Sequence, residues 1–357
     1  MRAAILHHVN EPLTIEAIEL DAPRAHEVLI RTAAAGICHS DLHFIDGLHS
    51  TRLPVIPGHE SAGVVEAVGS QVDYVEPGDH VITCMSAFCG ECAFCTTGRP
   101  YLCESPGLNR DDDSRISSGG NPIGQLYNLG SFSEKMLVHE RTVVKIGKDM
   151  PFDRAALIGC AVMTGYGAVV NTARVEPGSR VAVIGCGGIG LSAINGAAIA
   201  GAGQIIAIDV HDEKLELART FGATHAINAA RHDPVGSVHE LTGGGADYTF
   251  EAVGSKETTE QSFSMLRAGG DATVIGMVPE GQRVEIDASE LLYEKTLQGS
   301  NMGSNRFRVD MPRLIDFYLD GRLHLDELVA KRIALDDIND AFAEMRKGLI
   351  ARSVIVF

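Results

Sequence analysis

The chain is short of cysteine and of positive charge, and both shortages exclude classes of protein. Eight cysteines in 357 residues are too few for a scaffold held together by disulfides. Lysine and arginine number 30 against 47 aspartates and glutamates, which gives a formal charge of −17 at pH 7. A chain this acidic repels nucleic acid and anionic membranes, so we expect neither as a partner. The first residues contain no long apolar segment of the signal-peptide kind, and a cytoplasmic protein is expected.

Charged residues are also absent from one internal stretch, residues 181–208. The stretch is long enough to span a bilayer, but its seven glycines and three polar side chains argue against a membrane helix. Four apolar residues lead into a glycine-rich motif, an alanine-rich segment follows, and a second apolar run ends at Asp209. This order predicts a strand, a turn, a helix and a second strand, all buried.

The glycine-rich motif has the spacing of a dinucleotide-binding turn, Gly185-x-Gly187-x-x-Gly190. Gly185 allows the tight turn, Gly187 lets the backbone approach a pyrophosphate, and Gly190 lets the helix pack closely on the strand. Asp209 follows Gly190 by 19 residues, at the expected tip of the second strand. A plain strand–helix–strand unit that binds nothing is the alternative, because glycine-rich turns are common.

Length and rhythm predict two domains of different architecture. Residues 1–35 alternate apolar and polar side chains, which is typical of antiparallel strands. From about residue 162 to 300, strands and helices alternate, which predicts an α/β domain with a doubly wound parallel sheet. Residues 104–130 are rich in Gly, Asp, Asn and Ser and are expected to form a surface excursion. The clearest elements expected in the α/β part are helices 213–221 and 256–267 and strands 246–250 and 272–276.

Four of the cysteines are closely spaced, as Cys89-x2-Cys92-x2-Cys95-x7-Cys103. Four thiolates so close together can surround one tetrahedral zinc ion and leave it no open position, which is a structural site. An iron–sulfur cluster and disulfides are the alternatives; the cluster lacks a fourth cysteine followed by proline at ferredoxin spacing. Cys84 and Cys186 lie outside every metal-ligand pattern and are expected to be packing residues.

A second metal site would have to be assembled from Cys38, His59 and Cys160, which are far apart in the sequence. Two cysteines and one histidine leave zinc a fourth position for substrate, which is the catalytic arrangement. Asp41 could orient His59 as a hydrogen-bond acceptor, and Glu60 could approach the metal from behind. Sequence spacing does not show that these residues meet, and a single buried cysteine often only fills space.

Five motifs occur in order along the chain: Gly36-Ile-Cys38-His-Ser40-Asp41, Gly58-His59-Glu60-x2-Gly63-x5-Gly69-x2-Val72, the four-cysteine lobe, Gly159-Cys160-x3-Thr164-Gly-Tyr-Gly167 and Arg352-Ser-Val-Ile-Val-Phe357. Through these motifs, and along nearly its full length, the chain resembles the zinc-dependent medium-chain alcohol dehydrogenases. The resemblance implies a GroES-like catalytic domain of residues 1–161 and 302–357, with a Rossmann NAD-binding domain of residues 162–301 inserted in it. It also implies two zinc ions per chain, NAD as cofactor, and a homodimer paired through a strand near residues 297–303, with a homotetramer as the alternative.

The resemblance implies oxidation of an alcohol held on zinc, with hydride transfer to the nicotinamide. Ser40 would take the proton and pass it through the ribose to His43, while Thr164 and Ile189 hold the nicotinamide ring. Asp209 would accept the adenosine ribose hydroxyls and repel a 2′-phosphate, which favours NAD over NADP. The implied cofactor-binding residues are His39, Thr164, Gly185, Gly187, Gly188, Ile189, Gly190, Asp209, Lys214, Ile275, Met277 and Arg352.

Three positions differ from a related group of enzymes and limit the range of expected substrates. Glutathione-dependent formaldehyde dehydrogenases carry an acidic residue at the position of His49, an arginine near that of Gly107 and usually a tyrosine at that of His43. These differences count against a thiol-adduct formaldehyde dehydrogenase, which remains the alternative activity. A non-catalytic nucleotide-binding relative is the alternative class. The positions that match the family's substrate pocket are Met85, Leu102, Met277, His49 and Asn301. Met85 stands where an aromatic side chain often narrows that pocket, which favours medium or bulky alcohols.

Overall fold

The computed structural model describes residues 1–105, 114–348 and 352–357, and its contacts divide the chain into two units. The first unit contains Met1–Cys160, Arg306–Asp316 and Leu325–Phe357, and the second contains Ala161–Asn305 and Phe317–His324. This grouping differs from the expected domain bounds mainly at 317–324, which pack with the second unit. Gly107 lies outside the described residues.

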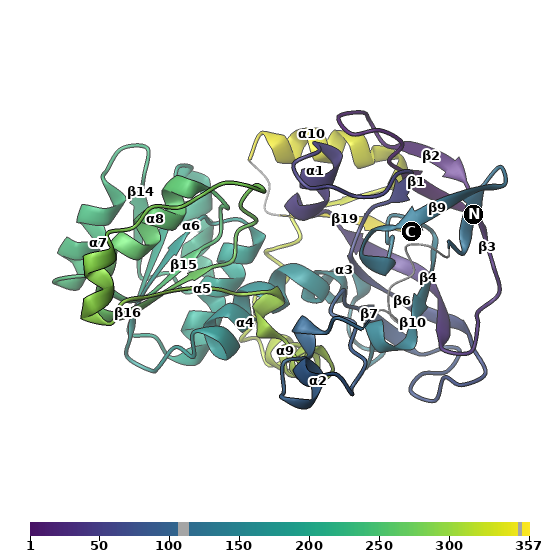
Figure 1. Ribbon diagram of the computed structural model, residues 1–357, viewed down its shortest axis with the longest axis horizontal. Coiled ribbons are helices and arrows are strands. Elements are labelled where there is room, and N and C mark those ends of the chain that lie inside the picture. The colour runs from purple at the N-terminus through teal and green to yellow at the C-terminus, as the bar shows by residue number, and fades with distance from the viewer. Residues whose placement is uncertain (106–113, 349–351) are drawn as a thin grey trace. The chain divides into compact units, whose positions relative to one another are not determined.

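The second unit is built on a six-stranded parallel sheet, as the alternating pattern predicts (Figure 1). Its strand order, β14-β13-β12-β15-β16-β17, runs outward in both directions from β12, which is the doubly wound arrangement. The strands are β12 (Arg180–Ile184), β13 (Gln204–Asp209), β14 (His225–Asn228), β15 (Ala246–Glu251), β16 (Leu266–Val274) and β17 (Thr296–Gly299). Helices α5 (Gly188–Ala200), α6 (Asp212–Thr220), α7 (Pro234–Thr242) and α8 (Lys256–Ser264) pack against them.

The uncharged stretch 181–208 forms the centre of this sheet. It consists of β12, the glycine-rich turn, α5 and most of β13, and nearly all of its apolar side chains are buried. The expected helix over 256–267 is too long, since α8 ends at Ser264 and Leu266 already pairs with Ala246 of β15. Pairing with a neighbouring strand thus outweighs local helix preference at this boundary.

One carboxylate, that of Asp247, ties the starts of three sheet strands together. Its Oδ2 accepts from the backbone N–H and the Nε of Arg180 at 2.6 and 3.1 Å, and Arg267 donates to its Oδ1. Burial alone would raise the pKa of Asp247, but the hydrogen bonds from Arg180 and Arg267 outweigh it and lower the pKa to about 2. The folded protein therefore stabilises the ionised form of this group.

Asp247→Asn is expected to lower the free energy of unfolding by about 2 kcal/mol at pH 7 and by about half as much at pH 3. The pKa is lower in the folded than in the unfolded chain, so the stabilisation is complete above about pH 4 and is lost as the pH falls toward 2. Urea unfolding at the two pH values measures the change, with Asp320→Asn, an exposed acid, as the control. An equal loss at both pH values would contradict the ion-pair explanation.

The first unit contains a seven-stranded, mostly antiparallel sheet of order β11-β7-β6-β4-β19-β18, with β10 also paired to β4. Its strands are β4 (Glu27–Gly36), β6 (Glu60–Val68), β7 (His80–Thr83), β10 (Lys135–His139), β11 (Val143–Ile146), β18 (Lys331–Ile333) and β19 (Ser353–Val356). Strand β19 pairs with β4, with Val354 opposite Gly36. The end of the chain thereby lies beside the residues that lead into Cys38.

Smaller elements complete the first unit. Strands β1 (Arg2–Ile5) and β2 (Thr14–Ala17) form a hairpin, and β3 (Glu19–Leu20), β8 (Ile116–Ser118), β9 (Asn121–Gln125) and β5 (Val55–Ile56) form a four-stranded sheet. The helices are α1 (His39–Ile45), α2 (Ala93–Thr96), α3 (Phe152–Leu157), most of α9 (Phe307–Leu319), and α10 (Ile338–Arg346).

The prediction of a surface excursion over 104–130 is wrong for its second half. Strands β8 and β9 lie within it, and Ile116, Ile123 and Leu126 are buried in the hydrophobic core of the first unit. Buried Arg115 pairs with Asp21 and with the equally buried Glu27, so even its charge is part of the interior. Composition alone misled here because three apolar side chains suffice to anchor a polar segment.

A continuous helical run, Phe152–Thr172, is long and apolar enough to cross a membrane by length and composition, with a mean hydropathy of 1.4. It comprises α3, α4 (Met163–Gly167) and two π-helical turns, Ile158–Val162 and Ala168–Thr172. Its most apolar window is 83% buried. Such burial is typical of the core helix of a water-exposed domain, which passes the same test.

Candidate functional site

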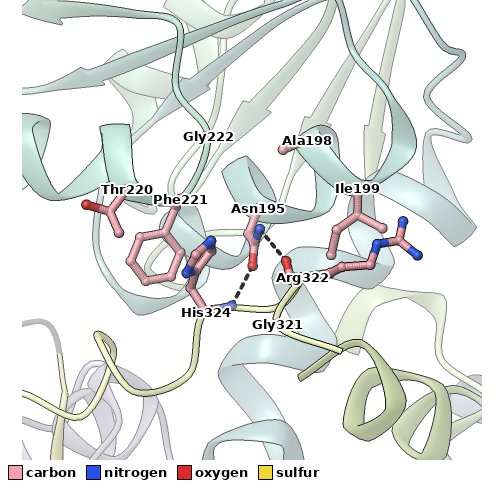
Figure 2. A pocket seen from close by; sticks show the side chains of 9 residues that line it. All are labelled: Asn195, Ala198, Ile199, Thr220, Phe221, Gly222, Gly321, Arg322 and His324. Carbon is pink, nitrogen blue, oxygen red and sulfur yellow. Dashed lines mark hydrogen bonds between the residues drawn. The ribbon is translucent and has the colours of Figure 1, made fainter. Parts of the chain in front are cut away.

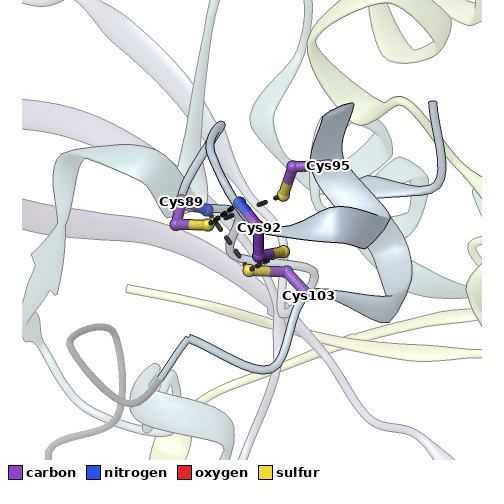
Figure 3. A group of neighbouring side chains, drawn as sticks. All are labelled: Cys89, Cys92, Cys95 and Cys103. Carbon is purple, nitrogen blue, oxygen red and sulfur yellow. Dashed lines mark hydrogen bonds between the residues drawn. The ribbon is translucent and has the colours of Figure 1, made fainter. Parts of the chain in front are cut away.

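Four cysteines converge in the lobe formed by residues 89–103 (Figure 3). Their sulfurs all lie within 4.8 Å of one another, and the pairs Cys89–Cys95 and Cys92–Cys103 are each separated by 3.9 Å. A disulfide bond is only about 2.05 Å long, and the described cysteines form none. Four zinc–sulfur bonds of about 2.3 Å in a tetrahedron place the sulfurs about 3.8 Å apart. The observed spacing therefore fits one zinc ion.

Backbone N–H groups favour the ionised form of these thiols. Glu91 and Cys92 donate to the sulfur of Cys89 at 3.4 and 3.2 Å, and these bonds lower the pKa of Cys89 to about 6. Cys89 donates in turn to the sulfur of Cys103 at 3.3 Å. Burial, by contrast, raises the pKa of Cys95 to about 12. Because the thiolate is the metal-binding form, the backbone bonds favour metal binding at Cys89, whereas burial opposes it at Cys95.

A second group brings together Cys38, His59, Glu60 and Cys160, whose ligand atoms also lie within 4.8 Å of one another. All four side chains are buried. The sheet explains how they meet, because antiparallel pairing of β4 and β6 puts Gly36 opposite Glu60. Cys38 follows β4 as the N-cap of α1, and His59 immediately precedes β6. Cys160 reaches the group from the π-helical turn after α3.

Asp41 holds the histidine of this group in one orientation. Its Oδ1 lies 3.1 Å from Nδ1 of His59 and accepts from the N–H of Gly58 at 2.9 Å. Burial alone would lower the pKa of His59, but the charge of Asp41 and its hydrogen bond raise it well above its ordinary value. The other ring nitrogen, Nε2, is buried and has no hydrogen-bond partner within the described ranges. A histidine oriented in this way by a carboxylate is typical of metal sites.

Arg352 places a positive charge behind the group. Its guanidinium lies 3.3 Å from Oε1 of Glu60 and donates to the carbonyl of Ile37 at 2.9 Å, with both charged side chains buried. Burial raises the pKa of Glu60 to about 7, although Arg352 opposes the shift. Glycine at position 36 leaves room for this group, because a Cβ there would overlap the Glu60 carboxylate unless that side chain moved.

Tyr127 is a contact of this group that the sequence did not reveal. Its ring packs edge-on against His59, with centroids 5.4 Å apart, and edge-on against Phe44, with centroids 5.6 Å apart. The backbone of Tyr127 has φ +54°, a region that bulky residues rarely adopt. No spacing motif marks this residue, and only its place in the fold brings it to His59.

The residues expected to move a proton lie on or beside α1. Ser40 Oγ is 3.6 Å from the sulfur of Cys38, and His43 lies one turn further along the helix. His39 is the first residue of the helix and is exposed. All three therefore belong to the same unit as the buried metal-ligand group.

The glycine-rich turn of the second unit has the geometry that its sequence predicts. Gly185 has φ +92°, and Gly187 is the N-cap of α5, which starts at Gly188. A Cβ on Gly190 would overlap the carbonyl of Gly185, whereas a Cβ on Gly187 would meet nothing within 4 Å. The turn therefore leaves space above Gly187, where the first N–H groups of α5 can receive an anion.

Asp209 closes this turn from the end of β13. Its Oδ2 accepts from the N–H of Cys186 at 2.8 Å, and its Oδ1 accepts from those of Val210 and His211 at 2.8 and 3.1 Å. The ammonium of Lys214 lies 4.0 Å from Oδ2. The two residues predicted to contact a ribose are thus neighbours.

Glu251, a buried acid at the end of β15, supports the same edge and was not predicted. Its Oε1 accepts from the N–H groups of Val253 and Gly254 at 2.8 and 2.7 Å, and its carbonyl accepts from that of Ile275 at 2.8 Å. It therefore fixes both the loop after β15, which carries Val253 and Gly254, and the loop after β16, which carries Ile275 and Met277. An acid after a buried strand, followed by a glycine, was the available signal.

The remaining predicted residues divide between the two units. Thr164 lies in α4 of the second unit, where its hydroxyl is 3.5 Å from the sulfur of Met302, and Ile189 is the second residue of α5. Of the expected pocket positions, Met85, Leu102 and His49 belong to the first unit and are partly buried. Met277 and Asn301 belong to the second.

An open surface pocket of about 270 Å³ in the second unit is lined by none of these residues (Figure 2). The amide of buried Asn195 bridges its floor, donating to the carbonyl of Arg322 at 3.2 Å and accepting from the N–H of His324 at 2.9 Å. It is lined by the second half of α5, the end of α6 and two loops, and no predicted site residue contributes. Its lining is Asn195, Ala198, Ile199, Thr220, Phe221, Gly222, Gly321, Arg322 and His324.

Comparison with known proteins agrees with this geometry. Residues 24–148 match the family described as the alcohol dehydrogenase GroES-like domain, and residues 188–320 match that described as zinc-binding dehydrogenase. The chain is 40% identical, over 99% of its length and 98% of the relative's, to the NDMA-dependent alcohol dehydrogenase of Amycolatopsis methanolica. The chain belongs to the zinc-dependent medium-chain dehydrogenase/reductases.

Two other members of this family are similarly close. The S-(hydroxymethyl)glutathione dehydrogenase of Paracoccus denitrificans is 37% identical over 100% of the chain and 99% of its own length. The solved structure of benzyl alcohol dehydrogenase from Acinetobacter calcoaceticus has a TM-score of 0.95 at 33% identity, over 100% of this chain and 99% of that one. The predicted fold class is confirmed, and membership of a zinc-binding family favours zinc over an iron–sulfur cluster in the four-cysteine lobe.

Proposed function

We propose that this medium-chain dehydrogenase reversibly oxidises a primary or secondary alcohol to an aldehyde or ketone, with hydride transfer to NAD. The observation that carries the proposal is the buried group of Cys38, His59 and Cys160, with Asp41 bonded behind the histidine. Two thiolates and one imidazole would hold a zinc ion and leave a fourth position for the alcohol. A zinc ion held there would lower the pKa of a bound hydroxyl and would polarise a carbonyl.

The chain's own residues would then move the proton and balance charge. Ser40, beside Cys38, would accept the hydroxyl proton, and His43 would carry it toward solvent. Glu60 would sit behind the metal, with Arg352 compensating its charge. Arg352 is also proposed to contact the cofactor, in addition to forming this buried ion pair with Glu60.

The second unit would hold the cofactor along its glycine-rich edge. Asp209 would accept the adenosine ribose hydroxyls with Lys214 beside it, and the N-terminus of α5 would face the pyrophosphate. His39 would contact the pyrophosphate, and the nicotinamide would lie at Thr164 and Ile189. The further cofactor contacts proposed are Gly185, Gly187, Gly188, Gly190, Ile275 and Met277. The catalytic domain is proposed to consist of residues 1–161 and 302–357, and the cofactor-binding domain of residues 162–301. The proposed location is the cytoplasm.

A panel of alcohols and aldehydes, followed at the nicotinamide absorbance together with the zinc content, tests this function. About two zinc ions per chain and NAD reduction by a medium or bulky alcohol are expected. Benzyl alcohol belongs in the panel because a related solved structure is named for it. A relative named for NDMA dependence makes NDMA the second acceptor to test, with extraction of any retained nicotinamide. A zinc-loaded protein inactive with every alcohol and both acceptors would overturn the proposal.

A thiol-adduct formaldehyde dehydrogenase is the second candidate, favoured by the 37% identity to a relative named for S-(hydroxymethyl)glutathione. His49 and His43 stand against it, because that group carries an acid and a tyrosine at these positions. Activity with S-(hydroxymethyl)glutathione above that with benzyl alcohol would select this candidate.

The chain is proposed to form a homodimer through the open edge of its parallel sheet. In the described chain β17 has a neighbour, β16, on one side only, and the preceding turn exposes Leu292 and Tyr293 by 85% and 64%. Leu292→Glu is expected to convert the dimer to a monomer at micromolar concentration, because it places a charge in an apolar contact. Light scattering measures this, with Leu319→Glu, at another exposed leucine, as the control. A monomeric wild-type protein would contradict the proposal.

A further inference from the structure

Two histidines outside the proposed metal ligands stack on each other at the end of α1. The rings of His43 and His49 have centroids 5.8 Å apart and planes inclined by 18°, which is an offset-stacked arrangement. The backbone supports the pair, because the N–H groups of Leu48 and His49 both donate to the carbonyl of His43, at 2.8 and 3.3 Å. The turn after α1 therefore folds back and lays one imidazole over the other.

Aromatic side chains connect this stack to the metal-ligand group. Phe44 packs against His49 with centroids 5.9 Å apart, and Tyr127 packs edge-on against Phe44 and against His59. His49 is thus held between the ring of Phe44 and that of His43. An imidazole packed between two rings has little freedom to turn, so it restricts the ring of His43 as well.

His43 has the surroundings of a group kept uncharged. It is partly buried, and its Nδ1 is buried with no hydrogen-bond partner among the residues that the structure describes. The titratable groups that face it are His49 from the turn, Cys38 from the start of α1 and Asp46 from its end, and Asp46 is paired with Arg346 of α10 at 2.5 Å. Burial and the neighbouring His49 together lower the pKa of His43.

We propose that His49 is a positioning residue, which fixes the ring of His43 and keeps it neutral so that it can accept the proton released by the alcohol. The proposal rests on the proposed function, in which that proton reaches His43 from Ser40. The transfer adds one proton to a ring nitrogen of neutral imidazole, and the imidazolium then releases it to water. An imidazole that is already protonated cannot accept the proton. A second ionisable ring stacked on His43 disfavours its protonation, and it therefore favours the proton transfer.

Two substitutions of His49 in the zinc-loaded full-length protein distinguish the effect of its stacked ring from the effect of its ionisable group. His49→Phe keeps a stacked ring and removes the ionisable group, whereas His49→Ala removes both. NMR titration of the His43 ring, assigned by the resonance lost in His43→Gln, is expected to show a pKa higher by about half to one unit in both variants. The acidic limb of kcat/KM against pH should move to higher pH by the same amount. His49→Ala should in addition lower kcat about fivefold.

His26→Phe is the matched control, because His26 stacks on His139 with the same centroid separation of 5.8 Å, outside the site. It should change neither the titration of His43 nor the pH profile. An unchanged His43 titration in His49→Phe, or a full kcat in His49→Ala, would overturn the proposal. If the wild-type protein oxidised no alcohol, the proposed function would fall, and the NMR titration would still decide whether His49 sets the charge of His43.

Discussion

Cys160→Ser is expected to reduce alcohol oxidation at least about a thousandfold, or about 4 kcal/mol of transition-state stabilisation, and to remove one of two zinc ions per chain. The reason is chemical: a serine hydroxyl stays protonated at neutral pH and does not replace a thiolate as a zinc ligand. Cys160 shares a buried group with Cys38 and His59. Steady-state kinetics with the best alcohol of the panel and metal analysis on the same sample measure both losses.

Two further cysteines make the result specific. Cys84 is fully buried and lies outside both ligand groups, so Cys84→Ala should keep both zinc ions and most of the activity. Cys95→Ser should instead lose the other zinc ion and lower the melting temperature by more than it lowers kcat, since its lobe has no position for a substrate. If Cys160→Ser kept full activity and two zinc ions, the assignment of the catalytic metal would be wrong.

Asp209→Gly combined with Val210→Arg is expected to raise kcat/KM for NADP relative to NAD by on the order of a hundredfold, or about 3 kcal/mol. The wild-type carboxylate would repel a 2′-phosphate and accept the ribose hydroxyls, and both effects disappear with it. Arginine next to it supplies a cation that can pair with the phosphate. Initial rates with both cofactors across a range of concentrations give the ratio.

Asp209 also supports the turn, because it accepts a hydrogen bond from the N–H of Cys186. The loss of its charge therefore has to be distinguished from the loss of this hydrogen bond. Asp209→Asn keeps an oxygen acceptor and loses the charge, and it should shift the ratio in the same direction by a smaller factor. Asp212→Asn, an acid three residues further along the chain that bonds Asn228 and Arg231, should leave the ratio unchanged. A wild-type protein that prefers NADP would contradict the assignment of Asp209.

Local patterns predicted the parts of the fold whose cause is local. The strand, turn and helix around Gly185 follow from an apolar run, a glycine at φ +92° and an uncharged helix, all within one short stretch. The four-cysteine lobe is equally local, since its ligands span only residues 89–103. In both cases the side chains that meet in space are already neighbours in the sequence.

The second ligand group shows where such prediction ends. Cys38, His59 and Cys160 could be named as candidates from their residue types, but no spacing showed that they meet. Their meeting depends on the pairing of β4 with β6 and on the π-helical turn that carries Cys160. Tyr127 was missed for the same reason, because no periodicity or spacing encodes an edge-on ring contact. Glu251 is different: the acid and the glycine after a buried strand were a local signal, but they did not show which loops the carboxylate would hold.

The pairing of β19 with β4 also has a consequence for the order in which the protein is made. Val354 and Gly36 are partners in that pairing, so a ribosome adds roughly 300 residues between them, which takes about 15 to 60 seconds at about 5 to 20 residues per second. During that time β4 lacks one neighbour, and Glu60 lacks the guanidinium of Arg352. The nascent chain therefore carries Cys38 and His59 in an incomplete pocket until residues 352–356 have left the exit tunnel.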